Sequence, residues 1–278
     1  MKRIFLLLAT TFALTTFTFA QDAPTTVHAP AYEGRIEYQK TQQPVAIIEL
    51  PYSQDVVDKG IKDYMGKRGY KSSSTKGFDV FRSAKFDDNS ESNDLYFKTD
   101  RKSRKEKDVT VITLLPAKPN QDILTRIGDS SVNDKIAAAK SFLDNLVPYL
   151  DAHNTDVQVN TQQEALKKAQ KNLTGLQDDQ LSLEKKQRNL IADQAQNKTD
   201  ILKQTQDITN TVTSDDNVKN KAQKKMNKLL DEQDNLNKKL RKVQSELDQN
   251  KIDQDKQTQE VQKQQQILDA FKAKQKTN

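Results

Sequence analysis

The feature that most constrains this chain is a long heptad pattern in its C-terminal half. Apolar or amide side chains recur there in alternating steps of three and four residues, which places them along one stripe of an α-helix and is typical of a coiled coil. We call these side chains the seam. It comprises Leu166, Ala169, Leu173, Leu176, Gln180, Leu183, Gln187, Leu190, Gln194, Asn197, Ile201, Gln204 and Ile208, and then Ala222, Met226, Leu229, Gln233, Leu236, Leu240, Val243, Leu247, Asn250, Gln254, Gln257, Val261, Gln264, Leu268 and Phe271.

The stretch between the two seam runs interrupts the heptads. It is rich in Thr, Asn, Ser and Asp, which favour turns and helix ends. Because the two runs have similar lengths, we expect an all-α antiparallel coiled-coil hairpin over residues 161–275, with its turn at about residues 209–218. Thr161 and Glu164 have the spacing of a capping box at its start. One continuous parallel dimer is the alternative.

Folding about that turn aligns seam residues whose numbers sum to 430. Two layers then pair amides, Asn197 with Gln233 and Gln180 with Asn250. Buried amides that meet can form hydrogen bonds, which fixes the register at a cost in stability. Other layers place glutamine beside an aliphatic residue. The seam is therefore weak, and either it is partly solvated or a partner adds another helix.

Residues 44–150 have the pattern of a small α+β domain. Short apolar runs predict strands at residues 45–50, 78–86, 95–97 and 109–115. A helix after Ser53 has the apolar stripe Val57, Gly60, Ile61, Tyr64 and Met65, with Gly69 at its C-terminal end. A second helix begins near Ser131 and is ended or kinked by Pro148. The order is strand, helix, three strands, helix, which predicts an antiparallel sheet covered on one face by helices. We expect residues 21–43 to form a flexible leader and residues 151–160 a linker.

Residues 1–20 have the pattern of a secretory signal peptide. Lys2 and Arg3 precede an uncharged run that ends in Thr18, Phe19 and Ala20, and polar residues follow. We expect cleavage near Ala20 and export to the periplasm or the medium, with a retained membrane anchor as the alternative. No later run approaches the ~20 apolar residues of a membrane-spanning helix, so we expect no transmembrane segment in the mature chain.

The composition argues against catalysis. The chain has no cysteine and two histidines, His28 and His153, which we expect to be solvated. It lacks the spacings of nucleotide-binding, serine-hydrolase, zinc-protease and EF-hand motifs. Its paired aspartates lie among polar residues that offer no burial to raise a pKa. We therefore expect no catalytic residue, no cofactor and no metal site. Since the net charge of +6 is a small excess on a highly charged chain, we do not expect nucleic acid as a partner.

The strongest local charge is a basic segment between two expected strands. It consists of Arg101, Lys102, Arg104, Lys105 and Lys107. This segment, which we call the basic tip, would project from a hairpin and could contact a polyanion or an anionic lipid. The simpler interpretation, which we favour, is a solvated turn whose charges prevent aggregation of strand edges.

These patterns together favour a non-enzymatic exported protein that is structural or mediates interactions. The coil would act as a spacer and as a surface for an unknown protein partner of the cell envelope, or for self-association, and the α+β domain would make a second contact. The alternative is a chaperone-like or polyanion-binding module that uses the basic tip and the lysine-rich faces of the coil.

Overall fold

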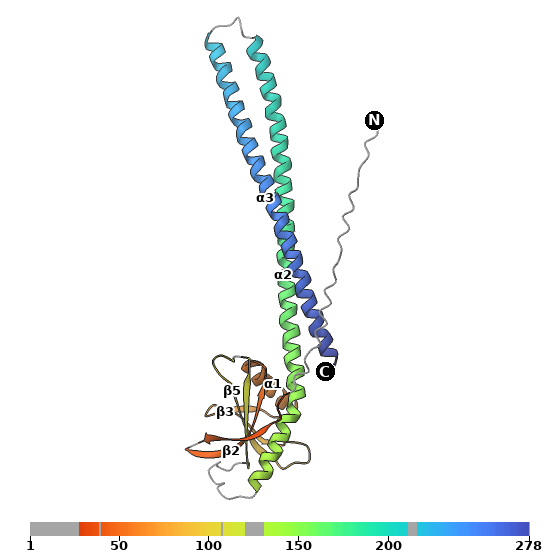
Figure 1. Cartoon of the computed structure of the whole chain (residues 1–278). Helices are drawn as coiled ribbons and strands as arrows, with labels where there is room; N and C mark the ends of the chain where they lie inside the picture. Colours follow the sequence, from red (N-terminus) through yellow and green to blue (C-terminus); the bar gives the residue numbers. More distant parts are fainter. Residues whose placement is uncertain (1–27, 39, 107, 120–130, 211–215, 278) are drawn as a thin grey trace, which may run out of the picture. The chain divides into compact units, whose positions relative to one another are not determined.

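The protein consists of two units, which meet between Leu150 and Asp151 (Figure 1). The structure is a computed structural model that describes residues 28–38, 40–106, 108–119, 131–210 and 216–277. The expected signal peptide, residues 211–215 of the expected turn and Lys107 of the basic tip lie outside these residues. The predicted fold class is confirmed, since an antiparallel sheet with helices precedes a helical hairpin.

The first unit, called here the α+β unit, is built on one six-stranded antiparallel sheet. Its strand order is β1-β2-β6-β5-β4-β3. The strands are β1 (Tyr32–Tyr38), β2 (Thr41–Leu50), β3 (Ser72–Thr75), β4 (Phe78–Ala84), β5 (Asn93–Arg101) and β6 (Thr110–Ala117). Helix α1 (Gln54–Lys67) follows β2, and α2 (Ser131–Asn210) follows β6.

Two of these strands correct the sequence prediction. Strand β1 lies within residues 21–43, where we expected a flexible leader, and pairs with β2 along its whole length. Strand β3 pairs with β4 through a two-residue turn, in which Lys76 and Gly77 both have positive φ, of 51° and 82°. That geometry matches the right-handed twist of a hairpin. Both strands are at sheet edges and largely polar, so neither shows an apolar run in the sequence.

Helices cover one face of the sheet, as predicted. Val57, Ile61 and Met65 of α1 and Leu143 and Leu146 of α2 pack against strand residues in one buried core. Ser53 is at the N-cap of α1, where its carbonyl, and not its side chain, accepts hydrogen bonds from the N–H groups of the first turn. Gly69 follows the C-cap with a φ of 87°. Glycine adopts this positive φ without a steric penalty, and the helix ends there.

The opposite face of the sheet is buried by its own curvature. Tyr38 of β1 contacts Phe78 of β4, with ring centroids 5.5 Å apart. Strands four positions apart in a flat sheet would be about 19 Å apart, so the sheet curls and the aromatic side chains lean towards each other. Tyr38, Phe78 and Tyr96 then form a second core with Val45, Val80, Leu115 and Ala117.

Helix α2 corrects two further predictions. It continues through Pro148, and residues 151–160, the expected linker, are helical. Proline removes one backbone hydrogen bond, but Leu146 and Leu150 on either side of it are buried in the core, which stabilises the helical conformation there. Because α2 runs without a break from Ser131 to Asn210, Thr161 lies inside this helix and its capping-box spacing does not mark a helix start.

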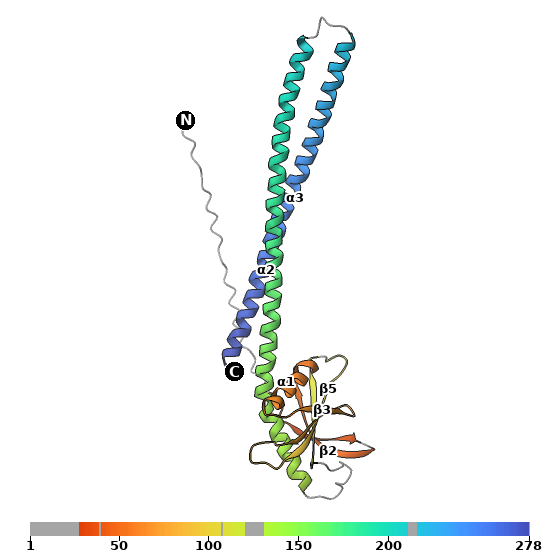
Figure 2. The same cartoon turned by 180° about the vertical axis from the view of Figure 1, so that it is seen from behind.

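The second unit, called here the coil, is the predicted antiparallel hairpin of α2 beyond Leu150 and α3 (Asp216–Thr277) (Figure 2). Every predicted seam residue is buried or half-buried. Hydrogen-bonded pairs range from Gln162 with Gln264, whose numbers sum to 426, to Gln180 with Gln254, whose numbers sum to 434. The observed register therefore brackets the predicted sum of 430. Among the described residues, no helix has the length and apolar character needed to cross a membrane.

Candidate functional site

Amide side chains hold the middle of the coil together. The Nδ2 of Asn250 donates to the carbonyl of Leu176 at 3.0 Å, and the Nε2 of Gln254 donates to Oε1 of Gln180 at 2.7 Å and to Oδ1 of Asn250 at 2.6 Å. The predicted layer of Gln180 and Asn250 is thus connected through Gln254. Glutamine also bonds backbone carbonyls of the facing helix elsewhere, as Gln257 does with Ala169. Such bonds replace apolar contacts and fix the register.

The second predicted amide layer has a different environment. Asn197 is buried, and its Oδ1 accepts no hydrogen bond. The Oε1 of Gln233 is also buried and has no hydrogen-bond partner. An unsatisfied buried acceptor costs about 1–3 kcal/mol. The layer of Asn197 and Gln233 is therefore a weak point of the seam, in contrast to the layer around Gln254.

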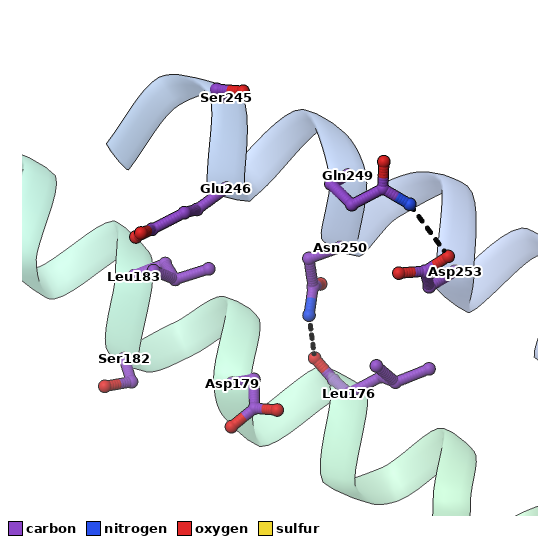
Figure 3. A pocket seen from close by; sticks show the side chains of 9 residues that line it. All are labelled: Leu176, Asp179, Ser182, Leu183, Ser245, Glu246, Gln249, Asn250 and Asp253. Carbon is purple, nitrogen blue, oxygen red and sulfur yellow. Dashed lines mark hydrogen bonds between the residues drawn. The ribbon is translucent and has the colours of Figure 1, made fainter. Parts of the chain in front are cut away.

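An open groove of about 590 Å³ lies along one side of the amide-bonded segment (Figure 3). Leu176 and Leu183 contribute to it from α2 and Asn250 from α3. Most other lining residues directly precede a seam residue, which places them on one side of the hairpin: Asp179, Ser182, Glu246, Gln249 and Asp253, joined by Ser245. We call it the acidic groove, because it has three carboxylates and no basic residue.

Lysine side chains next to the acidic groove partly neutralise two of its carboxylates. Glu246 is 3.9 Å from the ammonium of Lys186 and 3.8 Å from that of Lys242. Asp253 accepts a hydrogen bond from Gln249 and lies 3.6 Å from Lys256. These groups are solvent-accessible, and such pairs are worth little individually. The groove is thus suited to contact with a polar or basic surface.

A second groove, of about 380 Å³, opens on the other side of the same segment. Here the lining residues outside the seam directly follow a seam residue: Glu184, Arg188, Gln244, Asp248 and Lys251. We call this side of the coil the flank. Its charges are mixed in sign, unlike those of the acidic groove.

The basic tip is partly neutralised within the α+β unit. Lys102 forms an ion pair with Glu49 at 2.8 Å, and its hydrogen bond to that carboxylate raises the pKa of Lys102. The hydroxyl of Ser103 interacts with the carboxylate of Glu106 at 3.2 Å and accepts a bond from the Glu106 N–H. Arg101, Arg104 and Lys105 are exposed. The tip therefore has four exposed cations among its described residues, since Lys102 is also exposed, and one of the four is paired with Glu49.

A buried ion pair was not predicted from the sequence. Asp94 of β5 is 1% exposed, and its carboxylate accepts hydrogen bonds from Arg82 at 2.5 Å and from the Ser83 N–H at 2.9 Å. Arg82 also donates to the hydroxyl of Tyr96, and the bond to Asp94 raises the arginine pKa. A register shift in β4 and a φ of 50° at Ser83 create this arrangement. Arg82 and Asp94 are 12 residues apart in the sequence and lie on different strands, so no local sequence pattern predicts this ion pair.

A smaller charge cluster connects α1 to β4. The ammonium of Lys62 lies 2.9 Å from Asp58 and 3.0 Å from Asp79. Burial alone would raise the pKa of Asp79, but hydrogen bonds from Lys62 and Ser74 outweigh it, so that the pKa is lower than its ordinary value of 3.8. The ionised carboxylate is therefore the form that the folded state favours.

This shift predicts a loss of stability in acid. A carboxyl group whose pKa is lower in the folded state stabilises the fold above its ordinary pKa, and that contribution disappears as the pH falls through the folded pKa. Urea unfolding followed by tyrosine fluorescence should show a falling midpoint below about pH 4, and Asp79→Asn should reduce that fall. Asp88→Asn, at an exposed position, is the control. Equal pH dependence in the wild type and in Asp79→Asn would contradict the assignment.

The histidines are less exposed than predicted. The Nε2 of His28 is 3.4 Å from the hydroxyl of Tyr52. His153 is half-buried, and its Nε2 is buried without a hydrogen-bond partner. Among the residues described by the structure, no three His, Cys, Asp or Glu side chains form a group that could hold a metal ion.

The fold and grooves together define a class, an α+β unit followed by an amide-rich coiled-coil hairpin. Comparison of the chain with protein families, with curated proteins and with solved structures finds no match.

Proposed function

We propose that this is a non-enzymatic exported protein whose coil is a spacer and a surface for a protein partner of the cell envelope. The observation that carries the proposal is the surface of the coil. It has two open grooves on opposite sides of one segment, and Leu181, Ile191 and Leu202 are at least half exposed on α2. An interface combines apolar contacts with a polar rim, and this segment of the coil offers both.

Export is the second part of the proposal, and it rests on the sequence of residues 1–20. In this proposal the signal peptide is cleaved near Ala20 and the mature protein is periplasmic or secreted. The absence of cysteine from the chain is compatible with an oxidising compartment, since no thiol has to be protected there.

Polyanion binding through the basic tip and the lysine-rich coil faces is the alternative. The ion pair between Lys102 and Glu49 counts against it, because that cation already has a partner within the unit. Binding to anionic vesicles that weakens steeply as salt is raised would support the alternative, because release of counterions makes such binding depend on salt.

The proposal predicts both a mass and a crosslink. The mass of the protein recovered from the cell envelope or medium should correspond to a chain that begins near Gln21. A photoreactive residue at Gln249, in the acidic groove, should form one defined adduct in intact cells. The same residue at Ser73, exposed on the edge strand β3, is the matched control. Retention of residues 1–20 would refute cleavage near Ala20 and favour the membrane anchor, and recovery of the chain from the cytoplasm alone would refute export. Equal labelling at both sites would refute the coil as the partner surface.

A further inference from the structure

The flank of the coil carries most of its exposed aliphatic residues. Leu181, Ile191 and Leu202 of α2 are 63%, 50% and 62% exposed, and each directly follows a seam residue. Leu230 of α3, which follows seam residue Leu229, is 48% exposed on the same side. On the opposite side, the α2 residues that directly precede seam residues between 179 and 207 include no aliphatic residue. On α2 the exposed aliphatic residues are therefore confined to one side.

On the flank of α2, two pairs of residues lie at similar distances before and after Ile191, one pair both leucine and the other opposite in charge. Glu184 lies seven residues before Ile191, and Lys198 lies seven residues after it. Leu181 lies ten residues before Ile191, and Leu202 lies eleven residues after it. A helix with this sequence is complementary to a second copy of itself running in the opposite direction. Like meets like at the leucines, and opposite charges meet at Glu184 and Lys198.

We propose that two copies of this chain associate flank to flank and antiparallel, with a two-fold axis at Ile191. Ile191 then meets Ile191 of the second copy, and Leu181 meets Leu202. Glu184 meets Lys198 twice, since the contact is repeated on both sides of the axis. The groove on the flank, lined by Glu184, is where Lys198 of the second copy enters.

Helix α3 contributes complementary charges only, because its exposed flank leucine, Leu230, is level with Asp248 of the second copy. In the hairpin register, residue 239 is level with Ile191, and Asp234 and Arg241 follow seam residues on either side of that level. Antiparallel packing brings Asp234 of one copy within reach of the long side chain of Arg241 of the other. Unlike charges therefore face each other on both helices. Arg188 is level with Gln194 of the second copy, and the nearest flank residue to that level is Ala195, so no like charge opposes it on α2.

The size of this surface fits a reversible dimer. From residue 181 to residue 202 the helix rises about 32 Å, and two helices side by side are about 20 Å wide. About 600 Å² of each copy would be covered, or about 1,200 Å² in total, which is the lower limit for specific interfaces. A helix of an unrelated protein would not require the near-palindrome, which is the reason for assigning the flank to a second copy.

This inference deepens the proposed role of the coil as a partner surface, and its test uses the purified protein alone. Sedimentation equilibrium should show a monomer and a dimer in exchange. Ile191→Lys places two ammonium groups at the axis, and because like charges at an interface repel, it should weaken the dimer by about tenfold or more. Ile252→Lys is the matched control, because Ile252 is 49% exposed on α3 but outside the flank. Circular dichroism verifies that both variants remain folded.

Charge reversal and crosslinking test the geometry. Glu184→Lys should weaken the dimer, and adding Lys198→Glu should restore it. Since the chain has no cysteine, Ile191→Cys should yield a disulfide-linked dimer on mild oxidation, and Ile252→Cys should not. A mixture of Leu181→Cys and Leu202→Cys chains should form the mixed disulfide in preference to either symmetric one.

A monomer at every concentration would overturn the proposal, as would equal effects at Ile191 and Ile252 or a preference for symmetric Leu181 disulfides. None of these results depends on export or on an envelope partner. Failure of this inference is therefore distinguishable from failure of the proposed function.

Discussion

Arg82→Ala is expected to destabilise the α+β unit by about 2–3 kcal/mol. The substitution leaves the carboxylate of Asp94, whose side chain is 2% exposed, without its cationic partner. Removal of one partner from a fully buried ion pair costs about 3–5 kcal/mol. We expect less here, because the side chain of Arg82 is 52% exposed and water screens part of the interaction.

Urea unfolding followed by tyrosine fluorescence measures the stability of the α+β unit alone. All seven tyrosines precede residue 150, so the coil contributes no tyrosine signal. Lys98→Ala is the matched control, since Lys98 forms an ion pair of 2.7 Å with Asp100 in which both side chains are exposed. It should change the free energy of unfolding by less than about 0.5 kcal/mol. If Arg82→Ala were equally mild, the buried pair would have no structural role.

Replacing Asn197 and Gln233 together by leucine is expected to stabilise the coil by about 3 kcal/mol. Both residues belong to the seam, and each has a buried oxygen without a hydrogen-bond partner. Leucine removes the two unsatisfied acceptors and adds apolar contact in the same layer. Thermal melting followed by far-ultraviolet circular dichroism should show a higher midpoint for the helical signal.

Asn250→Leu is the control for the double variant. Asn250 is also a buried seam amide, but its Nδ2 donates to Leu176 and its Oδ1 accepts from Gln254. Its replacement should leave the midpoint unchanged or lower it. A gain at Asn250 equal to that at the Asn197 and Gln233 layer would mean that the hydrogen bonds of the seam amides do not contribute to stability.

The coil could be predicted from the sequence because its stabilising contacts repeat every few residues. Side-chain type alone identified the seam, and the lengths of its two runs identified the register. The α+β unit was predicted less completely. Strands β1 and β3 are stabilised by edge pairing and by the curl that brings Tyr38 to Phe78, and neither leaves a local pattern. Pro148 was misleading, because burial of the residues around it outweighs the lost hydrogen bond.

The candidate interaction surfaces could be predicted only in part. The basic tip is contiguous in sequence, but the ion pair that connects Lys102 to Glu49 joins residues far apart in the chain. The two grooves exist because residues of α2 and α3 separated by about 70 positions lie side by side, as Leu176 and Asn250 do in Figure 3. Heptad positions assign residues to a side of the coil, but they do not show where that side is hollow.

The many glutamine and asparagine side chains of the seam affect how the coil responds to temperature. Exposure of apolar surface raises the heat capacity of unfolding and exposure of polar surface lowers it, so that an amide-rich seam gives a small net change. The free energy of unfolding then varies almost linearly with temperature and shows little loss on cooling. The α+β unit buries aromatic and aliphatic cores and has the opposite behaviour. One chain thus combines a coil whose free energy of unfolding changes almost linearly with temperature and an α+β unit whose free energy of unfolding curves strongly with temperature.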